Sequence, residues 1–300
     1  MIYDIYHKTS FEYQGMVTFS HNVARLKPRE NSFQKIVDFS MEVVPSLYEE
    51  HSFLDAFGNT NTHLLIRKPH SSLSVIGRSR VEVFPEILQA HTQRMKQGSV
   101  CYEKAIALLN GFDSHDLMAK KYRFESELIS KGSDAIKAYV QESFHPKRDI
   151  YEAAYEFMER IFNDFEFVAG FSDVTTPIEE IFEAKKGVCQ DFTQFAIAAL
   201  RTIGLPAKYI SGYIETQPRD GEIKLFGVDA SHAWFALYIP RMGWVAFDPT
   251  NNLIPTSQHI FLSQGRDYND IAPLKGVVMS SGSSKLQIAV DVKRVGEHSL

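Results

Sequence analysis

Strand-type alternation of polar and apolar residues dominates the chain up to about residue 84. Apolar residues recur at every second position, as at Leu73 and Val75 and again at Val81 and Val83. This spacing puts them on one face of a strand, and turn-type residues separate the successive runs. We therefore expect residues 1–84 to form an N-terminal β-sandwich-like domain of several short strands.

Near Pro85 the pattern changes to residues that favour helices. Apolar and helix-forming residues cluster around Ala105 and again around Phe157, and Pro146 lies between the two clusters as a helix break. We expect residues 85–150 to be a helical connecting region.

Residues 151–252 combine a strong helix with strands, and we expect them to form the core domain. From Cys189 to Ile203, apolar residues follow the i, i+3, i+4, i+7 spacing of one helix face, and Pro206 prevents continuation of the helix. Strand-type segments follow at 207–215, 229–239 and 243–248. Residues 253–300 are interpreted as a C-terminal extension with a terminal strand. The predicted class is α+β.

Composition excludes several classes of protein. The 300 residues are 44% hydrophobic and 23% charged, as in an ordinary globular protein. A net charge of -5 without a dense basic run gives no indication of nucleic acid or an anionic membrane as a partner. No apolar stretch approaches the roughly 18 residues of a membrane span, and no secretory signal is visible. Because two cysteines cannot build a disulfide framework, we expect a cytoplasmic protein.

Cys189 carries the strongest chemical signal, because it opens the amphipathic helix. The unpaired N–H groups and the dipole at a helix N-terminus favour a thiolate. The alternative is a small buried hydrophobic residue, as most free cysteines are. The other cysteine, Cys101, is predicted to lie in the middle of a helix and to be structural.

His232 and Asp248 lie on neighbouring predicted strands. Alternation within 229–239 puts His232 and Trp234 on one face. If the hairpin loop has an odd number of residues, the residue numbers of two facing positions add up to an even number. A total of 480 puts His232 directly opposite Asp248, and a total of 482 puts it one diagonal step away. Taken singly, the histidine could be a core or surface residue and the aspartate a turn residue. With Cys189 they form the cysteine, histidine and acid that a thiol nucleophile requires.

Competing motifs are missing or weak. The sequence contains no G-x-S-x-G, no G-x-x-x-x-G-K-[ST], no H-E-x-x-H and no C-x-x-C. The eleven histidines are scattered without metal-ligand spacing. We therefore expect neither a metal nor a cofactor.

Three segments together resemble the core of the bacterial transglutaminase-like superfamily, which includes transglutaminase-like enzymes and cysteine proteases. They are Gly187–Phe192, Ala230–Trp234 and Gly243–Asn251. The N-terminal strands resemble the β-rich domain of this family, and Gly265–Tyr268 resembles its C-terminal extension. The resemblance covers roughly the whole chain. It implies a papain-like core, in which the helix bearing the cysteine packs on an antiparallel sheet.

The resemblance implies that Cys189 is the nucleophile, His232 the general base and acid, and Asp248 the acid that orients the histidine. Eukaryotic transglutaminases take an oxyanion donor from an upstream tryptophan, whereas both tryptophans here follow Cys189. The backbone N–H of Cys189 is the one donor that can be named.

Three further residues near these motifs are candidates for supporting roles. Asp191, in the first helical turn, is interpreted as structural because a carboxylate there favours the helix dipole. Trp234 and Tyr213 are candidates for lining a substrate cleft, and core packing is the alternative for both.

The expected function is acyl transfer through a thioester on Cys189, with a protein or peptide as substrate. Transfer to water would make the chain a cysteine peptidase or amidase, which we favour. Transfer to an amine would make it a transglutaminase. A non-catalytic peptide-binding module using the same cleft is a third hypothesis. The lack of a calcium-loop signature argues against a regulated animal-type enzyme.

Overall fold

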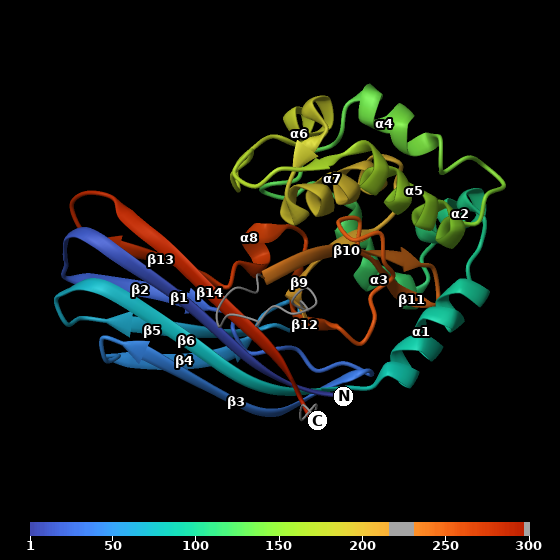
Figure 1. Cartoon of the computed structure of the whole chain (residues 1–300). Helices are drawn as coiled ribbons and strands as arrows, with labels where there is room; N and C mark the ends of the chain where they lie inside the picture. Colours follow the sequence, from blue (N-terminus) through green and yellow to red (C-terminus); the bar gives the residue numbers. More distant parts are fainter. Residues whose placement is uncertain (216–230, 297–300) are drawn as a thin grey trace, which may run out of the picture.

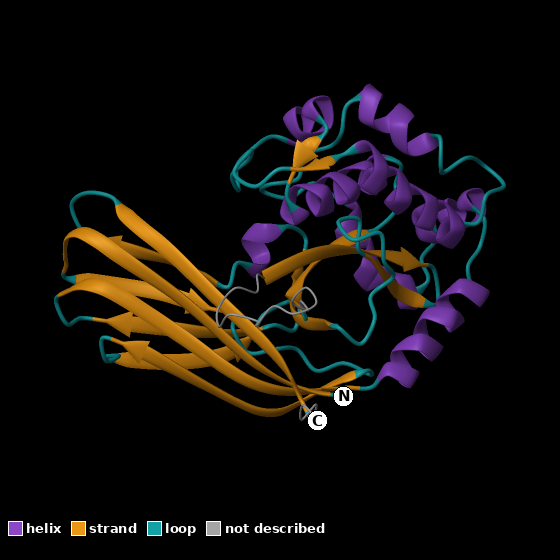
Figure 2. Ribbon diagram, in the orientation of Figure 1, coloured by secondary structure: helices purple, strands orange, loops and turns teal. Residues whose placement is uncertain are grey.

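The computed structural model of the chain describes residues 1–215 and 231–296. Figure 1 shows a β-sandwich beside a unit in which helices cover a further sheet. Figure 2 separates the two by secondary structure, with nearly all helices on the same side of the molecule. The predicted α+β class with a β-rich N-terminal region is confirmed.

The sandwich contains two four-stranded antiparallel sheets. The first has the order β14 (Ser284–Val295), β1 (Ile2–Val17), β6 (His70–Val83) and β3 (Gln34–Val44). The second has the order β13 (Leu274–Met279), β2 (Phe19–Ala24), β5 (Thr60–Ile66) and β4 (Glu49–Leu54). Buried residues alternate with less buried ones along the first half of β1 and the whole of β2, as the sequence pattern predicts.

The C-terminal part of the chain returns to this sandwich. β14 pairs with β1 and β13 pairs with β2, both antiparallel. β12 (His259–Gly265), in contrast, belongs to the sheet of the helical unit. Residues 253–300, expected to form one extension, are therefore shared between the two parts of the molecule.

Six α-helices and a short 3-10 turn fill the region between the sandwich and the nucleophile helix. They are α1 (Pro85–Gln97), α2 (Tyr102–Asn110), α3 (Ser114–Lys120), η1 (Lys121–Arg123), α4 (Asp134–Gln141), α5 (Ile150–Asp164) and α6 (Ile178–Ala184). Pro146 lies between α4 and α5, where a break was predicted. The side chain of Asp149 caps α5 by accepting hydrogen bonds from Tyr151 N and Glu152 N, which satisfies two of its free N–H groups. Cys101 is the N-cap of α2, so its predicted mid-helix position is wrong.

The helical unit is built around α7 (Cys189–Thr202) and a four-stranded antiparallel sheet. The strands run in the order β11 (Gly243–Phe247), β10 (Ser231–Ile239), β9 (Ala207–Ile214) and β12. Ala233, Phe235 and Leu237 join the core formed with α7, whereas Trp234 and Ala236 belong to a cluster on the other face. The alternation predicted for this strand is confirmed from Ala233 to Leu237, whereas Tyr238, expected on the face of Trp234, joins the core with α7. Two residues of the expected 229–239 strand, Asp229 and Ala230, lie outside the described residues.

Short elements complete this unit. β7 (Glu166–Phe167) and β8 (Lys186–Gly187) form a parallel pair just before α7, and α8 (Tyr268–Ile271) follows β12. Among the described residues, no helix is long and apolar enough to cross a membrane.

The sandwich and the sheet of the helical unit share a small apolar core. Tyr3, Val81 and Val292 of the sandwich cluster there with Tyr213 and Ile260. At its polar end, His7 of β1 forms a 2.9 Å hydrogen bond through Nδ1 to the Tyr213 hydroxyl. Burial lowers the pKa of His7 to about 4, so the imidazole at this junction is neutral at ordinary pH.

The substitution His7→Gln tests this junction. His7 takes up a proton near pH 6.5 in the unfolded chain and near pH 4 in the folded chain. The unfolded chain therefore binds the proton more readily, and the free energy of unfolding decreases as the pH falls between these values. The loss amounts to about 3 kcal/mol at pH 4. Glutamine keeps a polar contact but does not titrate. Between pH 7 and pH 4 the free energy of unfolding should therefore fall by about 3 kcal/mol less in the variant than in wild type. Urea unfolding at both pH values measures it, with the exposed His145→Gln as control; identical pH dependence in wild type and variant would contradict the expectation.

Candidate active site

Cys189 is the first residue of α7 and is partly buried. The helix begins there because Val188 is extended, with φ of -118° and ψ of -179°. An N–H at this position has no partner within the helix, and no hydrogen bond from it is seen among the described residues. The thiol and one backbone donor of Cys189 are thus available at the same helix end.

Asp191 supports the start of this helix. Its Oδ2 accepts a 2.7 Å hydrogen bond from Val188 N and another from the Ser172 hydroxyl. The side chain is almost fully buried, and burial raises the pKa of Asp191 in spite of these bonds. These contacts agree with the structural interpretation of this residue, because they fix the backbone immediately before the cysteine.

The β10–β11 hairpin brings His232 and Asp248 together. Phe235 pairs with Phe247 and Ile239 with Gly243. The residue numbers of facing positions therefore add up to 482, and the loop has three residues. This is the diagonal arrangement that the sequence allowed. The Nε2 atom of His232 lies 2.7 Å from Oδ2 of Asp248, which leaves Nδ1 as the ring nitrogen that can serve Cys189.

Asp248 is completely buried and is held by several donors at once. Its Oδ1 accepts hydrogen bonds from Thr250 N (3.0 Å) and Asn251 N (3.3 Å). Its Oδ2 accepts from the Asn251 side chain at 2.8 Å as well as from His232. A buried carboxylate needs such donors to remain charged.

A second histidine, His259, also contacts Asp248 and was not predicted. Its Nε2 lies 3.1 Å from the same Oδ2 atom. Its Nδ1 accepts a 3.2 Å hydrogen bond from Thr256 N, so the proton of the neutral ring is on Nε2, facing the carboxylate. His259 opens β12, which pairs with β9 and not with the hairpin. Only this long-range pairing brings the residue to the site, and no local sequence signal marks it.

The charges at the site follow from these contacts. Burial alone would lower the pKa of His232, but its hydrogen bonds to Asp248 and Cys189 raise that pKa to about 10. Burial alone would raise the pKa of Asp248, but hydrogen bonds from His232 and His259 hold it well below the ordinary value. For His259 burial prevails and lowers the pKa. The arrangement favours a charged pair, His232 with Asp248, next to a neutral His259.

The same three side chains could also be considered as metal ligands. His232, Asp248 and His259 each offer one ligand atom, and these atoms lie within 4.8 Å of one another. All three are buried, and each already has its partner in the hydrogen bonds described above. The separations of 2.7 and 3.1 Å are those of direct hydrogen bonds, so this donor set is satisfied as a proton network.

Among the described residues, Trp234 and Tyr213 are buried, as expected for core packing, the alternative to lining a substrate cleft. Trp234 is fully buried and packs edge-on against His259, with ring centroids 5.3 Å apart. A Cβ at Gly212, opposite His232, would come within 2.4 Å of the Trp234 ring, so glycine makes room for it. Tyr213 is buried at the junction with the sandwich, bonded to His7. Both residues support the site from behind.

A cysteine at a helix N-terminus, with a histidine and an aspartate on an adjacent hairpin, defines the papain-like class of thiol site. Comparison with known proteins agrees. The family model "Transglutaminase-like superfamily" matches residues 137–249, and "Bacterial transglutaminase-like N-terminal region" matches residues 3–82. The chain belongs to the transglutaminase-like superfamily.

Among its relatives are uncharacterized proteins from mycobacteria. Protein Rv2569c of Mycobacterium tuberculosis is 32% identical over 295 residues, which cover 97% of this chain and 92% of the relative. A segment of 77 residues, 25% of this chain and 11% of the other protein, is 31% identical to a protein-glutamine gamma-glutamyltransferase of Pseudomonas aeruginosa. A crystal structure from Cytophaga hutchinsonii, described as that of a candidate cysteine protease, has a TM-score of 0.74 at 18% identity. The superposition covers 100% of this chain and 92% of the Cytophaga hutchinsonii chain, so the two proteins share the fold.

The substitution His259→Phe tests the role of the second histidine. Phenylalanine keeps a ring against Trp234 but leaves Thr256 N and one lone pair of Asp248 without their partner. We expect the free energy of unfolding to fall by about 1–3 kcal/mol. The matched variant His259→Gln retains a side-chain donor and should lose less. Urea unfolding at pH 7 measures both, and equal stability of His259→Phe and wild type would show that this contact contributes nothing.

Proposed function

We propose that this protein is a thiol-dependent acyl-transfer enzyme that acts on a peptide or carboxamide. The proposal is supported above all by the convergence of Cys189, His232 and Asp248 from a helix N-terminus and a hairpin. A histidine with a pKa of about 10, held by a buried carboxylate, is suited to stabilise a thiolate beside it. A reduced thiol is also consistent with a cytoplasmic location, which we include in the proposal.

In the first step the Cys189 thiolate attacks the carbonyl carbon of the substrate, and its electron pair moves to the oxygen. The N–H of Cys189 donates a hydrogen bond to that oxyanion. When the tetrahedral intermediate collapses, the bond from carbon to nitrogen breaks and His232 gives its proton to the departing amine or ammonia. The products of this step are a thioester on Cys189 and a neutral His232.

The second step differs between the two enzymatic alternatives. In hydrolysis His232 takes a proton from water and the hydroxyl attacks the thioester carbon. The carbon–sulfur bond then breaks, which releases a carboxylic acid and restores the Cys189 thiolate beside protonated His232. In transamidation a primary amine takes the place of water and a new amide forms. We favour hydrolysis, and the segment similar to the Pseudomonas aeruginosa gamma-glutamyltransferase keeps transamidation as the second candidate.

Protein-bound glutamine is a suitable first substrate class, because its side-chain carboxamide fits both alternatives. Incubation with a blocked glutamine peptide should release ammonia, and mass spectrometry should show a gain of about one mass unit on the peptide. If a primary amine is added and the peptide instead gains the mass of the amine less ammonia, the second candidate is correct. Cleavage of a backbone peptide bond of the substrate would indicate a peptidase.

Cys189→Ala should abolish turnover, whereas Cys101→Ala, the matched control on the other cysteine, should leave it unchanged. A chelator should not reduce the rate, because no step of this mechanism uses a metal. Turnover that survives Cys189→Ala would refute the thiol mechanism. If wild type and Cys189→Ala bind peptide equally and neither turns it over, the chain is the non-catalytic binding module.

A further inference from the structure

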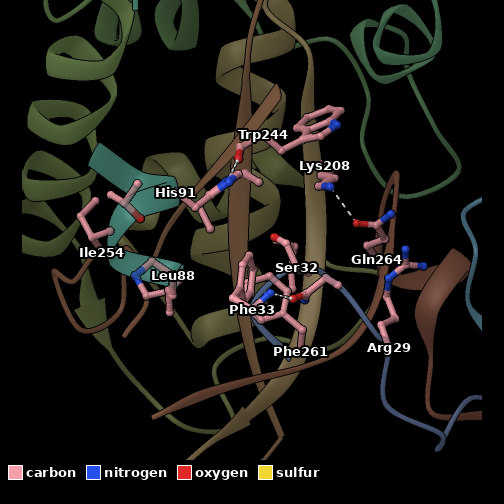
Figure 3. A pocket seen from close by; sticks show the side chains of 16 residues that line it. Arg29, Ser32, Phe33, Leu88, His91, Lys208, Trp244, Ile254, Phe261 and Gln264 are labelled. Carbon is pink, nitrogen blue, oxygen red and sulfur yellow. Dashed lines mark hydrogen bonds between the residues drawn. The ribbon is translucent and has the colours of Figure 1, made fainter. Parts of the chain in front are cut away.

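The face of the sheet turned away from α7 borders a small cavity of about 220 Å³. Sheet residues Lys208, Ala236, Trp244 and Phe261 line it from one side, and Figure 3 shows several of these side chains directed into it. The loop before β3 and helix α1 close the other side. Ser32, at its edge, is exposed, so the cavity borders the surface.

Lys208 is the unusual member of this lining, because a lysine is rarely buried without a partner charge. Its side chain is 7% exposed. The Nζ atom donates one hydrogen bond, 2.7 Å long, to Gln264 Oε1 and lies 4.4 Å from the centre of the Trp244 ring. Among the described residues no carboxylate forms a hydrogen bond or ion pair with it. An ammonium has three donors, so two of them have no hydrogen-bond acceptor in the part of the chain that the structure describes, and they adjoin the cavity.

The neighbouring charge increases this imbalance. Burial, and after it the positive charge of Arg29, lowers the pKa of the Lys208 amine to about 7. The Arg29 guanidinium is itself hydrogen-bonded to neutral oxygens, those of Phe57 and the Asn59 side chain. Two cationic side chains therefore border one mostly apolar cavity. The carboxylate of Asp55 already acts on Arg29, so a negative group placed in the cavity would compensate the charge of Lys208 above all.

We propose that this cavity binds a small carboxylate with an apolar body, with its negative group on Lys208 and its body against Trp244 and Phe261. A volume of about 220 Å³ is below the roughly 300–1,000 Å³ of common ligand pockets, so the site suits a single-ring molecule and not a peptide. Trp234 packs against Phe261 on one side and His259 on the other, and thus separates this site from the cysteine. The proposal does not depend on the enzymatic activity.

Binding should weaken as the pH rises from 6 to 9, because the carboxylate prefers the charged amine. The charged group that acts on Lys208 is Arg29 from the loop. His91 of α1 lines the same cavity, and Tyr122 of η1 packs on the Trp244 ring. His91 forms a hydrogen bond through Nε2 to the Trp244 carbonyl, and burial raises the pKa of Tyr122 to about 12. The variant His91→Gln should therefore keep the pH dependence.

Isothermal titration calorimetry with the full chain tests the proposal, with benzoate as probe and neutral benzamide as its matched partner. We expect benzoate to bind more tightly than benzamide, and Lys208→Met to reduce its affinity at least 10-fold while benzamide is unaffected. Lys35→Met, on an exposed lysine of β3, is the surface control, and Cys189→Ala should bind benzoate like wild type.

Three results would overturn the proposal. The first is that wild type does not bind benzoate at concentrations up to about 10 mM, which is far weaker than a built site would give. The others are equal affinities of benzoate and benzamide, and an unchanged benzoate affinity in Lys208→Met. If Lys208→Met fails to fold, Ala236→Leu provides a second variant that fills the cavity without altering its charge. This variant must then lose benzoate binding, and retained binding would equally contradict the site.

Discussion

The buried carboxylate of Asp248 is the constraint on which the rest of the site depends. A charged group with no exposure to water is stable only if donors surround it, and here they come from His232, Asn251, His259 and the backbone. These donors belong to β10, to β12 and to the loop between β11 and β12. Satisfying one carboxylate therefore fixes the hairpin, the 248–253 loop and the start of β12 relative to one another.

The two faces of the same sheet have different tasks. One face packs against α7, so the position of Cys189 is set by an extensive apolar core. The other face carries Trp234 and Phe261 and continues into the cavity around Lys208. The sandwich holds the end of this sheet that carries His232 and His259, through Tyr213 and Ile260. The return of β13 and β14 pairs the C-terminal strands with β2 and β1 of that support.

The parts predicted from sequence are those encoded by local periodicity. The spacing of apolar residues defines α7 and places Cys189 at its start, and the alternation in β10 with a short hairpin brings His232 near Asp248. His259 and Lys208 could not be predicted, because their roles arise from pairing between distant strands and from closure of the cavity by the residues near Arg29. The burial of Tyr213 has the same origin, since the sandwich that covers it is remote in sequence. Cys101 was misplaced because a helix boundary depends on one extended residue, which periodicity does not resolve.

The most direct measurement is the rate of iodoacetamide alkylation of each cysteine against pH, read by mass spectrometry in the intact protein. Cys101 serves as the internal reference in the same molecule. If Cys189 and His232 form a thiolate–imidazolium pair, Cys189 will react far faster than Cys101 below pH 7, and His232→Ala will remove that advantage. Equal rates for both cysteines across the pH range, or a Cys189 rate unaffected by His232→Ala, would contradict the pair and the acyl-transfer mechanism built on it.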